Sequence, residues 1–256
     1  MTEEFWKTAI TQIKPGEIRV RGFDIAELMG TVSYAEAVYL VLKGELPSKA
    51  EARMIEAILV ASIDHGPTPP SVLAARTVLS GGNSLNASVA AGVMAIGDVH
   101  GGAVEQCARI LQEKARQEGS PATVAAALVE ELHQQKRRMP GFGHRLHGTD
   151  PRTVRLLALA KETAFWGRHI DLAVQIEEEL EKKLDRRLPM NVDGAVAAAI
   201  SDMGFDWRLG KGFFIVSRVA GLVAHVHEEW TRERPMRKLG PPASEYDGPK
   251  PRKVKR

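Results

Sequence analysis

The sequence predicts an all-α fold, because helix-start signals and helical apolar spacing occur along most of its 256 residues. Ser33 with Glu36, and Ser48 with Glu51, both have the serine and the glutamate of a capping box ahead of an apolar run. The β-branched residues are scattered among alanine, leucine and glutamate instead of forming alternating runs. Strand signals are therefore too few for a fold built on a sheet.

The other elements follow in chain order. Residues 16–20 are the one segment that looks extended. Residues 86–97 are rich in alanine, glycine and serine, so we expect a helix that packs closely on several sides and lies centrally in the fold. Ser120-Pro121 and Asp150-Pro151 each start a helix, because serine and aspartate cap it and proline fits its first turn. A last helix is predicted by apolar residues at helical spacing: Ile215, Val219, Leu222 and Val226.

The charge is concentrated at the C-terminal end of the chain. Residues 239–256 hold five lysines and arginines against two acidic residues, which accounts for the whole formal charge of +3. We expect this basic, proline-rich tail to be disordered and residues 1–238 to form the folded region. Nucleic acid is not an expected partner, because the basic residues form no stripe on the folded region.

Cys107 is the single cysteine, so no internal disulfide can form and a reducing compartment, the cytoplasm, is expected. The acidic N-terminus lacks the apolar stretch of a signal peptide. The longest apolar tract, over residues 213–226, contains an arginine and a histidine, so we expect no membrane-spanning segment.

The most informative segment is residues 139–152, where His144 stands in a glycine turn and Arg152 follows eight residues later. Gly141 and Gly143 let the backbone come close to a bulky ligand. An imidazole and a guanidinium at this spacing suit a polarised carbonyl next to a carboxylate. We therefore expect a ligand where the helix after Asp150 begins.

Three further side chains have both a functional and a structural interpretation. His100 precedes a glycine pair, so it is either a site residue or the polar end of a helix before a glycine C-cap. Asp193 is either an N-cap or a base whose pKa is raised by burial. Arg218 interrupts a helix too apolar for the surface, so its anionic partner is either a structural acidic residue or a substrate carboxylate.

In their order and spacing these motifs resemble the citrate synthase family. The resemblance begins with an N-terminal signature over residues 18–25 and 34–47. It continues along the chain through these motifs: Asp64-His65-Gly66, His100-Gly101-Gly102-Ala103, Pro140-Gly141-Phe142-Gly143-His144, Asn191-Val192-Asp193 and Ser217-Arg218. It therefore covers nearly the whole chain.

The resemblance implies a multi-helix enzyme with a large helical domain and a small CoA-side domain over roughly residues 104–210, within a catalytic region 1–238. It implies a homodimer, or a higher even oligomer, with active sites near the subunit interface. The substrates would be acetyl-CoA and oxaloacetate, or a related keto acid, or their adduct citryl-CoA. Coenzyme A would enter as a thioester substrate, and neither a bound cofactor nor a metal is expected.

Roles carry over residue by residue. Asp193 would take the proton from the acetyl methyl group, His100 would hydrogen-bond the thioester oxygen, and His144 would polarise the ketone. This suits the chemistry, because a weakly acidic α-proton needs both a carboxylate and a donor for the developing enolate. Arg152 and Arg218 match arginines that hold the oxaloacetate carboxylates, and Arg234 matches one supplied by the neighbouring subunit. Alternatively, Arg234 belongs to a solvated charge cluster at a helix end.

CoA is expected along the glycine turn. The candidate contacts are Pro140, Gly141, Phe142, Gly143, Arg145 and Arg186. Both arginines also have an explanation as exposed surface charges.

Two departures concern the subtype. Ser62 stands where full-length citrate synthases carry a histidine, and the chain is shorter than those enzymes. Residues 64–67 and 95–98 look like those of short citryl-CoA lyases and the lyase module of ATP-citrate lyase. That module has a phenylalanine at the position of His100, so His100 keeps a synthase possible. His65 matches a histidine that is assigned a catalytic part in the lyases, or it is a core histidine.

Three functions are therefore weighed. The preferred one is cleavage of citryl-CoA or the reverse condensation. The second is a citrate synthase that also hydrolyses the thioester, and the third is a catalytically silent acyl-CoA-binding protein. His225 and His227 are two residues apart on a helix, so they point to different faces and form no zinc pair. The remaining histidines are expected at the surface or in an interface: His133, His147 and His169.

Overall fold

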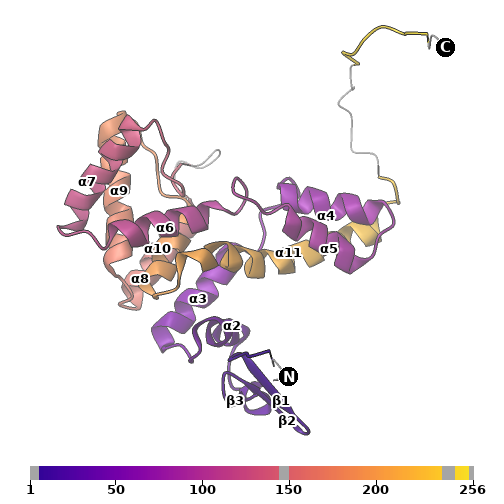
Figure 1. The fold of residues 1–256 in the computed structure, drawn as a ribbon, viewed down its shortest axis with the longest axis horizontal. Helices are drawn as coiled ribbons and strands as arrows, with labels where there is room; N and C mark the ends of the chain where they lie inside the picture. The colour runs from indigo at the N-terminus through magenta and orange to yellow at the C-terminus, as the bar shows by residue number, and fades with distance from the viewer. Residues whose placement is uncertain (1–5, 144–149, 238–245, 254–256) are drawn as a thin grey trace, which may run out of the picture.

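A computed structural model describes residues 6–143, 150–237 and 246–253, and these form eleven α-helices, a 3-10 turn and one small sheet (Figure 1). The prediction of an all-α class is confirmed. The sheet is an antiparallel meander of β1 (Thr11–Lys14), β2 (Glu17–Val20) and β3 (Phe23–Asp24), with Lys14 opposite Glu17 at the first turn. The segment predicted to be extended thus supplies the central strand.

Local sequence signals set where most helices begin. Both capping boxes form, at Ser33 and Ser48, and the side chains of Ser120 and Asp150 cap their helices as predicted. The helices are α1 (Ile25–Leu28), α2 (Tyr34–Lys43), α3 (Lys49–Ala61), α4 (Pro70–Ser80), α5 (Leu85–Met94), α6 (Ala103–Lys114), α7 (Pro121–Gln134), α8 (Pro151–Glu162), α9 (Arg168–Leu184), α10 (Val192–Asp202) and α11 (Gly210–Arg232), with the 3-10 turn η1 (Trp207–Leu209) before the last.

The larger hydrophobic core belongs to what we call the body: α2, α3, α6 to α10 and the first turns of α11. Its centre is α10, which packs against α6, α8 and α9 (Figure 1). Alanine fills much of α10, and the segment from Gly194 to Ser201 is buried throughout. Small side chains let three helices approach it closely, so the body covers its central helix without help.

The second core is small and belongs to what we call the arm: α4, α5 and the C-terminal half of α11. Here Gly92 faces α4 so closely that a Cβ atom would stand 2.9 Å from the Ser71 carbonyl oxygen. The expectation that the helix within residues 86–97 is central is nevertheless wrong for this chain. Only Ser88 and Gly92 of α5 are buried, and Met94 is 85% exposed, because no other element of the described chain covers its outer face.

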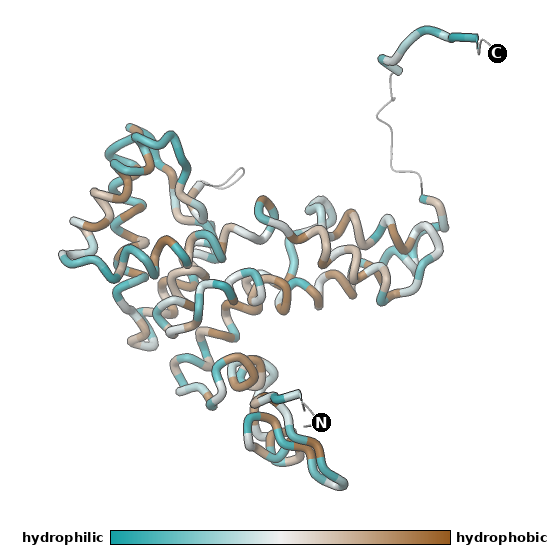
Figure 2. Tube along the Cα trace, in the orientation of Figure 1, coloured by the Kyte–Doolittle hydropathy of each residue, from teal (hydrophilic) through white to brown (hydrophobic). Residues whose placement is uncertain are grey.

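Helix α11 runs through both regions, with Phe213 in the body core and Leu222 and Val226 in the arm core. By length and composition, the continuous helical stretch Trp207–Arg232 is apolar enough to cross a membrane. We interpret it as a core helix, since it supplies Phe213 to one core and Leu222 and Val226 to the other, and Figure 2 shows apolar residues along its length. Residues 246–253 are exposed and contain neither helix nor strand, and the division of the body at residues 104–210 stays a prediction.

Candidate active site

The carboxyl group of Asp193 stands in the first turn of α10, at the centre of the body. The N-cap of this helix is Asn191, whose side-chain oxygen accepts from the backbone N–H groups of Asp193, at 2.9 Å, and Gly194. The N-cap interpretation of Asp193 is therefore wrong, and its carboxyl is available for other work. Burial raises the pKa of Asp193 above its usual range, although the charges of Arg152 and Arg218 oppose the rise.

Arg218 is a cation with an unused hydrogen-bond donor. The residue is only 2% exposed, its Nε donates to the Ser62 carbonyl oxygen at 3.0 Å, and its guanidinium lies 4.6 Å from the centre of the Phe214 ring. Its buried Nη1 has no hydrogen-bond partner, and within the described ranges Arg218 makes no ion pair. A buried donor left unpaired is costly, so this geometry favours an anionic ligand over a structural acidic partner.

His100 lies in the turn between α5 and α6. There it exchanges two backbone hydrogen bonds with Gly97, at 3.0 and 3.1 Å. Its helix-end interpretation is wrong, since α5 ends at Met94 with Ala95 as the C-cap. The Nε2 atom is 2.8 Å from the hydroxyl of buried Ser71. Burial, helped by the charge of Arg218, lowers the pKa of His100, so the imidazole is held neutral.

His65 stands on the loop between α3 and α4, and it is exposed, so its interpretation as a core histidine is wrong. The preceding Asp64 accepts hydrogen bonds from the Gly66 N–H and from the His225 ring, each at 2.9 Å. His225 is thereby paired with a carboxylate. Among the residues that the structure describes, no three histidine, cysteine or acidic side chains cluster as metal ligands would.

Arg152 is held by a carboxylate of its own chain. Its Nε and Nη2 atoms donate to Asp150 at 3.0 and 2.9 Å, and its Nη1 donates more weakly to the Ala61 carbonyl at 3.4 Å. The guanidinium is still partly exposed. Since its charge acts on the pKa of Asp193, Arg152 belongs to the same site as that carboxyl.

The sequence therefore predicted several groups that the fold gathers. Arg218 influences the pKa of both Asp193 and His100, and His65 also influences that of His100. His144 and Arg145 lie outside the described residues, as does His147. Sequence reasoning missed Ser71 and Asp64, because only tertiary structure reveals their histidine partners, and it saw Asp150 as a helix cap alone.

Arg234 is not part of this group within one chain. It is exposed beyond the end of α11, next to Pro235 at the tip of the arm. The helix rises about 1.5 Å per residue, so Arg218 lies roughly 21 Å from the end of α11 at Arg232, and Arg234 lies beyond that end. Its assignment to a neighbouring subunit's site stays a prediction.

The glycine turn before α8 is fastened to the start of α10. Gly141 and Gly143 have φ angles of +81° and +86°, which favour glycine as expected. Asn191 N–H donates to the Gly141 carbonyl at 3.0 Å, and the Gly143 N–H donates to the Pro189 carbonyl at 2.7 Å. A Cβ atom on Gly194 would stand 2.5 Å from the Gly141 oxygen. The glycine turn and the start of the Asp193 helix are therefore held together by two hydrogen bonds and close backbone packing.

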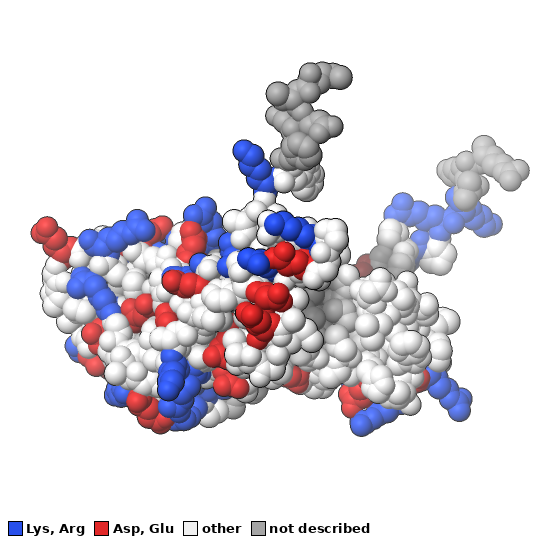
Figure 3. All heavy atoms as spheres, turned by 90° about the horizontal axis from the view of Figure 1, so that it is seen from below, with Lys and Arg blue, Asp and Glu red and all other residues white. Residues whose placement is uncertain are grey.

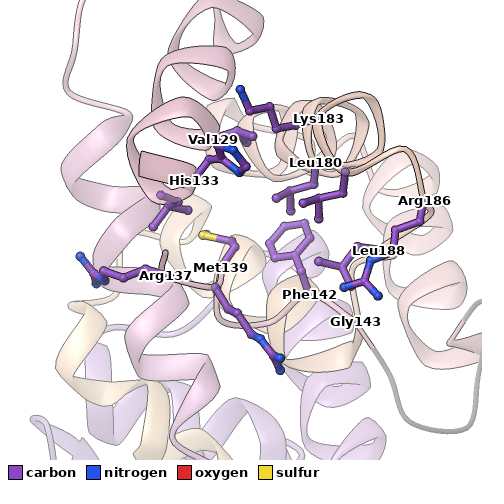
Figure 4. Close-up of a pocket in the computed structure, with 13 residues that line it drawn as sticks. Val129, His133, Arg137, Met139, Phe142, Gly143, Leu180, Lys183, Arg186 and Leu188 are labelled. Carbon is purple, nitrogen blue, oxygen red and sulfur yellow. The ribbon is translucent and has the colours of Figure 1, made fainter. Parts of the chain in front are cut away.

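A cavity of about 550 Å³ opens beside this turn, between α7, α9 and the turn itself (Figure 4). Phe142 points into it toward Leu180, and Gly143 and Arg186 also line it; their assignment as CoA contacts stays a prediction. Gly141 packs against α10 instead. The polar lining residues that the sequence analysis did not select for this site are His133, Arg137, Arg138 and Lys183. The basic run directly before Met139 was the available signal.

Comparisons with known proteins agree with this arrangement. The profile of the citrate synthase C-terminal domain matches residues 3–54 and 48–239. A citryl-CoA lyase from Hydrogenobacter thermophilus is 49% identical, with a TM-score of 0.92 over 98% of each chain. An ATP citrate lyase from Methanothrix soehngenii, in complex with citrate and coenzyme A, is 22% identical with a TM-score of 0.84, over 98% of this chain and 43% of that one. At that identity the likeness concerns the fold alone.

Curated relatives are more distant. Citrate synthase 2 of Bacillus subtilis (strain 168) is 29% identical over 235 residues, which are 90% of this chain and 60% of that protein. The citrate synthase of Haloferax volcanii is also 29% identical, over 90% of this chain and 59% of that protein. The chain thus spans about 60% of the length of these relatives.

Proposed function

Because the chain belongs to the citrate synthase family, we propose that it breaks citryl-CoA into acetyl-CoA and oxaloacetate, or joins the two in the reverse direction. The single observation that carries this proposal is that two unlike groups share one site. Burial raises the pKa of the Asp193 carboxyl, which stands near the buried guanidinium of Arg218 with its unused donor. The first suits proton transfer at carbon, and the second suits a substrate carboxylate.

Proton transfer falls to Asp193. A raised pKa makes its carboxylate a stronger base toward the acetyl methyl group in condensation. In cleavage the same group, protonated, returns the proton to the enol. His100 serves the thioester oxygen: if its Nε2 accepts from the Ser71 hydroxyl, its Nδ1–H is the donor, so the neutral imidazole still offers one N–H to that oxygen.

Two arginines would hold the keto-acid part. Arg218 presents its unfilled Nη1, and Arg152, although paired with Asp150, remains partly exposed. His144 would polarise the ketone and, in cleavage, take the proton from the citryl hydroxyl. His65 would also take a catalytic part. Two observations support this: the Asp64–His225 pair holds its loop, and the charge of His65 acts on the pKa of His100.

The CoA thioester would enter through the cavity beside the glycine turn. Its apolar wall includes Phe142 and Leu180, and its cations include Arg137, Arg138 and Arg186, which suit a ligand with a flat base and phosphates (Figure 4). Arg145 remains a proposed contact.

We further propose a homodimer formed through the arm, in the cytoplasm. The arm supports the dimer, since its surface seen in Figure 3 carries few charges and it exposes Met94 and Trp230. Such pairing would also bring Arg234 within reach of a neighbouring site. The single, buried Cys107 supports a reducing compartment.

The test uses two assays on the purified protein. Citryl-CoA is supplied and oxaloacetate is followed with coupled malate dehydrogenase; separately, acetyl-CoA and oxaloacetate are supplied and thiol release is followed. Turnover in the first assay, lost in Asp193→Asn with CoA affinity nearly unchanged, is the expected result. Thiol release in the second assay would identify a citrate synthase. CoA binding with no turnover in either assay would identify the silent protein.

A further inference from the structure

We infer that Asp150 is a positioning residue for Asp193: its carboxylate joins the start of α8, the Arg152 guanidinium and the start of α10 into one unit. This unit fixes where the Asp193 carboxyl stands and which charges face it. The inference rests on the proposed function, in which Asp193 carries the proton.

The hydrogen bonds of Asp150 exceed what a helix cap needs. The residue is 1% exposed, and each of its carboxylate oxygens accepts two bonds. Oδ1 accepts from the backbone N–H and the Nε of Arg152, both at 3.0 Å. Oδ2 accepts from the Arg152 Nη2 at 2.9 Å and from the Val192 N–H at 3.2 Å. A capping aspartate uses one oxygen for one backbone donor, so the remaining bonds serve another purpose.

The hydrogen bond from the Val192 N–H ties Asp150 to the residue that directly precedes Asp193. Val192 is the first residue of α10 and precedes Asp193 in the chain. Any shift of this turn would move the Asp193 carboxyl, and proton transfer requires its position within a few tenths of an ångström. Asp150 therefore couples the position of Asp193 to the helix that supplies Arg152.

The charge of Asp150 matters as much as its geometry. The groups that face Asp193 are Arg152 and Asp150 at the start of α8, Arg218 from α11 and the thiol of Cys107 from α6. Asp150 balances one of the two guanidinium charges. It counteracts the effect of the arginines on the pKa of Asp193, while its own pKa is kept low by the bonds from Arg152, against the effect of burial. Asp150 is therefore ionised when Asp193 gains or loses its proton.

The test is Asp150→Asn, which keeps the shape and one acceptor but removes the charge. Asp202→Asn is the matched control, because Asp202 stands at the other end of α10 and is likewise a buried carboxylate. It accepts three backbone N–H groups, from Gly167, His169 and Ile170, and lies 2.7 Å from the His169 ring. Both variants lose a buried charge with a cationic or ring partner, but only the first lies beside Asp193.

Turnover is measured against pH in both directions. Condensation needs ionised Asp193, so its rate rises with pH through that pKa; cleavage needs the protonated form, so its rate falls with pH through it. Asp150→Asn leaves both arginine charges without a balancing carboxylate, so the pH midpoints of both rate profiles should fall by about one unit and kcat should fall about tenfold. Asp202→Asn should shift neither midpoint. Equal pH midpoints in Asp150→Asn and the wild type would overturn the inference, because a purely structural role lowers activity or stability without shifting a midpoint.

A second measurement does not depend on turnover. Infrared titration of the substrate-free protein follows the protonated Asp193 carboxyl band, identified by its loss in Asp193→Asn. Its midpoint should move to lower pH in Asp150→Asn and to higher pH in Arg152→Gln, which leaves the negative charge of Asp150 unbalanced. Should Asp150→Asn fail to fold, the Arg152→Gln shift decides, and an unchanged or lowered midpoint there overturns the inference. If the wild type lacks turnover but the midpoints move as stated, the proposed function fails and the inference stands.

Discussion

The body and the arm both contain a helix rich in small residues, yet only the body covers its own. In α10 the stretch from Gly194 to Ser201 is buried, whereas α5 buries Ser88 and Gly92 alone. The two helices have similar compositions and both allow a close approach, at Gly194 and at Gly92. Small residues therefore predict that something packs closely on a helix, but not whether it comes from the same chain.

The candidate chemistry is divided between the same two regions. Asp193 and the cavity proposed for CoA belong to the body, while Ser71, the partner of His100, belongs to the arm. Arg218 lies on α11 between the two cores. The body should therefore retain CoA binding when the arm is disturbed, although turnover should not survive.

The largest effect is expected from Met94→Glu on the outer face of α5. If the chain dimerises through the arm as proposed, a charge buried in that interface should dissociate the dimer and lower turnover at least about 100-fold, with CoA affinity of the body retained. Mass by light scattering and CoA titration measure the two parts. Met29→Glu, at another largely exposed methionine near the N-terminal sheet, is the control. A dimeric, active Met94→Glu protein would contradict the idea that a second chain covers α5.

Arg218→Lys tests the crossing point of the two regions. Lysine keeps the charge but loses the planar fork that can donate to a carboxylate while Nε remains bonded to Ser62. We expect the KM for oxaloacetate to rise about 30- to 100-fold, with CoA affinity unchanged within about twofold. Steady-state kinetics with each substrate varied in turn provide the measurement. An unchanged KM would mean that the keto acid binds elsewhere.

Arg186→Ala sharpens the description of the body cavity. Losing one phosphate-directed charge should raise the dissociation constant for CoA about three- to tenfold, and the difference should shrink at high salt. Isothermal titration at two salt concentrations gives both values. Lys182→Ala is the control, because Lys182 is on α9 but is paired with Glu179 and does not line the cavity. Equal losses in the two variants would point to a general charge effect.

The smallest effect concerns stability. The folded pKa of Asp193 is raised above its unfolded value, so its stabilising neutral form is fully present below the unfolded pKa and is lost as pH rises through the folded one. At neutral pH Asp193→Asn should therefore raise Tm. Because ~1 kcal/mol moves Tm by ~2–4 °C in a chain of this size, we expect a few degrees.

Calorimetry at pH 7 and pH 4 checks the sign, since the gain should shrink at the lower pH. Asp206→Asn, at an exposed carboxylate, is the comparison. A lower Tm in Asp193→Asn at pH 7 would mean that the ionised carboxylate stabilises the fold.

The sequence was sufficient where the signal is local. The caps at Ser33, Ser48, Ser120 and Asp150 each depend on neighbouring residues, so the helix starts could be predicted. Two candidate site residues could also be selected: Arg218 because it interrupts an apolar helix, and Asp193 because it stands at a predicted helix start within a family motif. The hydrogen-bond partners of the histidines could not be predicted, because they are distant in the chain: Ser71 is 29 residues from His100, and Asp64 is 161 residues from His225. Such pairings exist only once helices have packed.

The unbroken course of α11 has a mechanical consequence. One helix carries Phe213 into the first core and Val226 into the second, with Arg218 midway. A regular helix bends only gently unless something interrupts its hydrogen bonds. Tilting the distal end of α11 would therefore also move Arg218, so the position of this proposed carboxylate-binding residue depends on the packing at both ends of the helix.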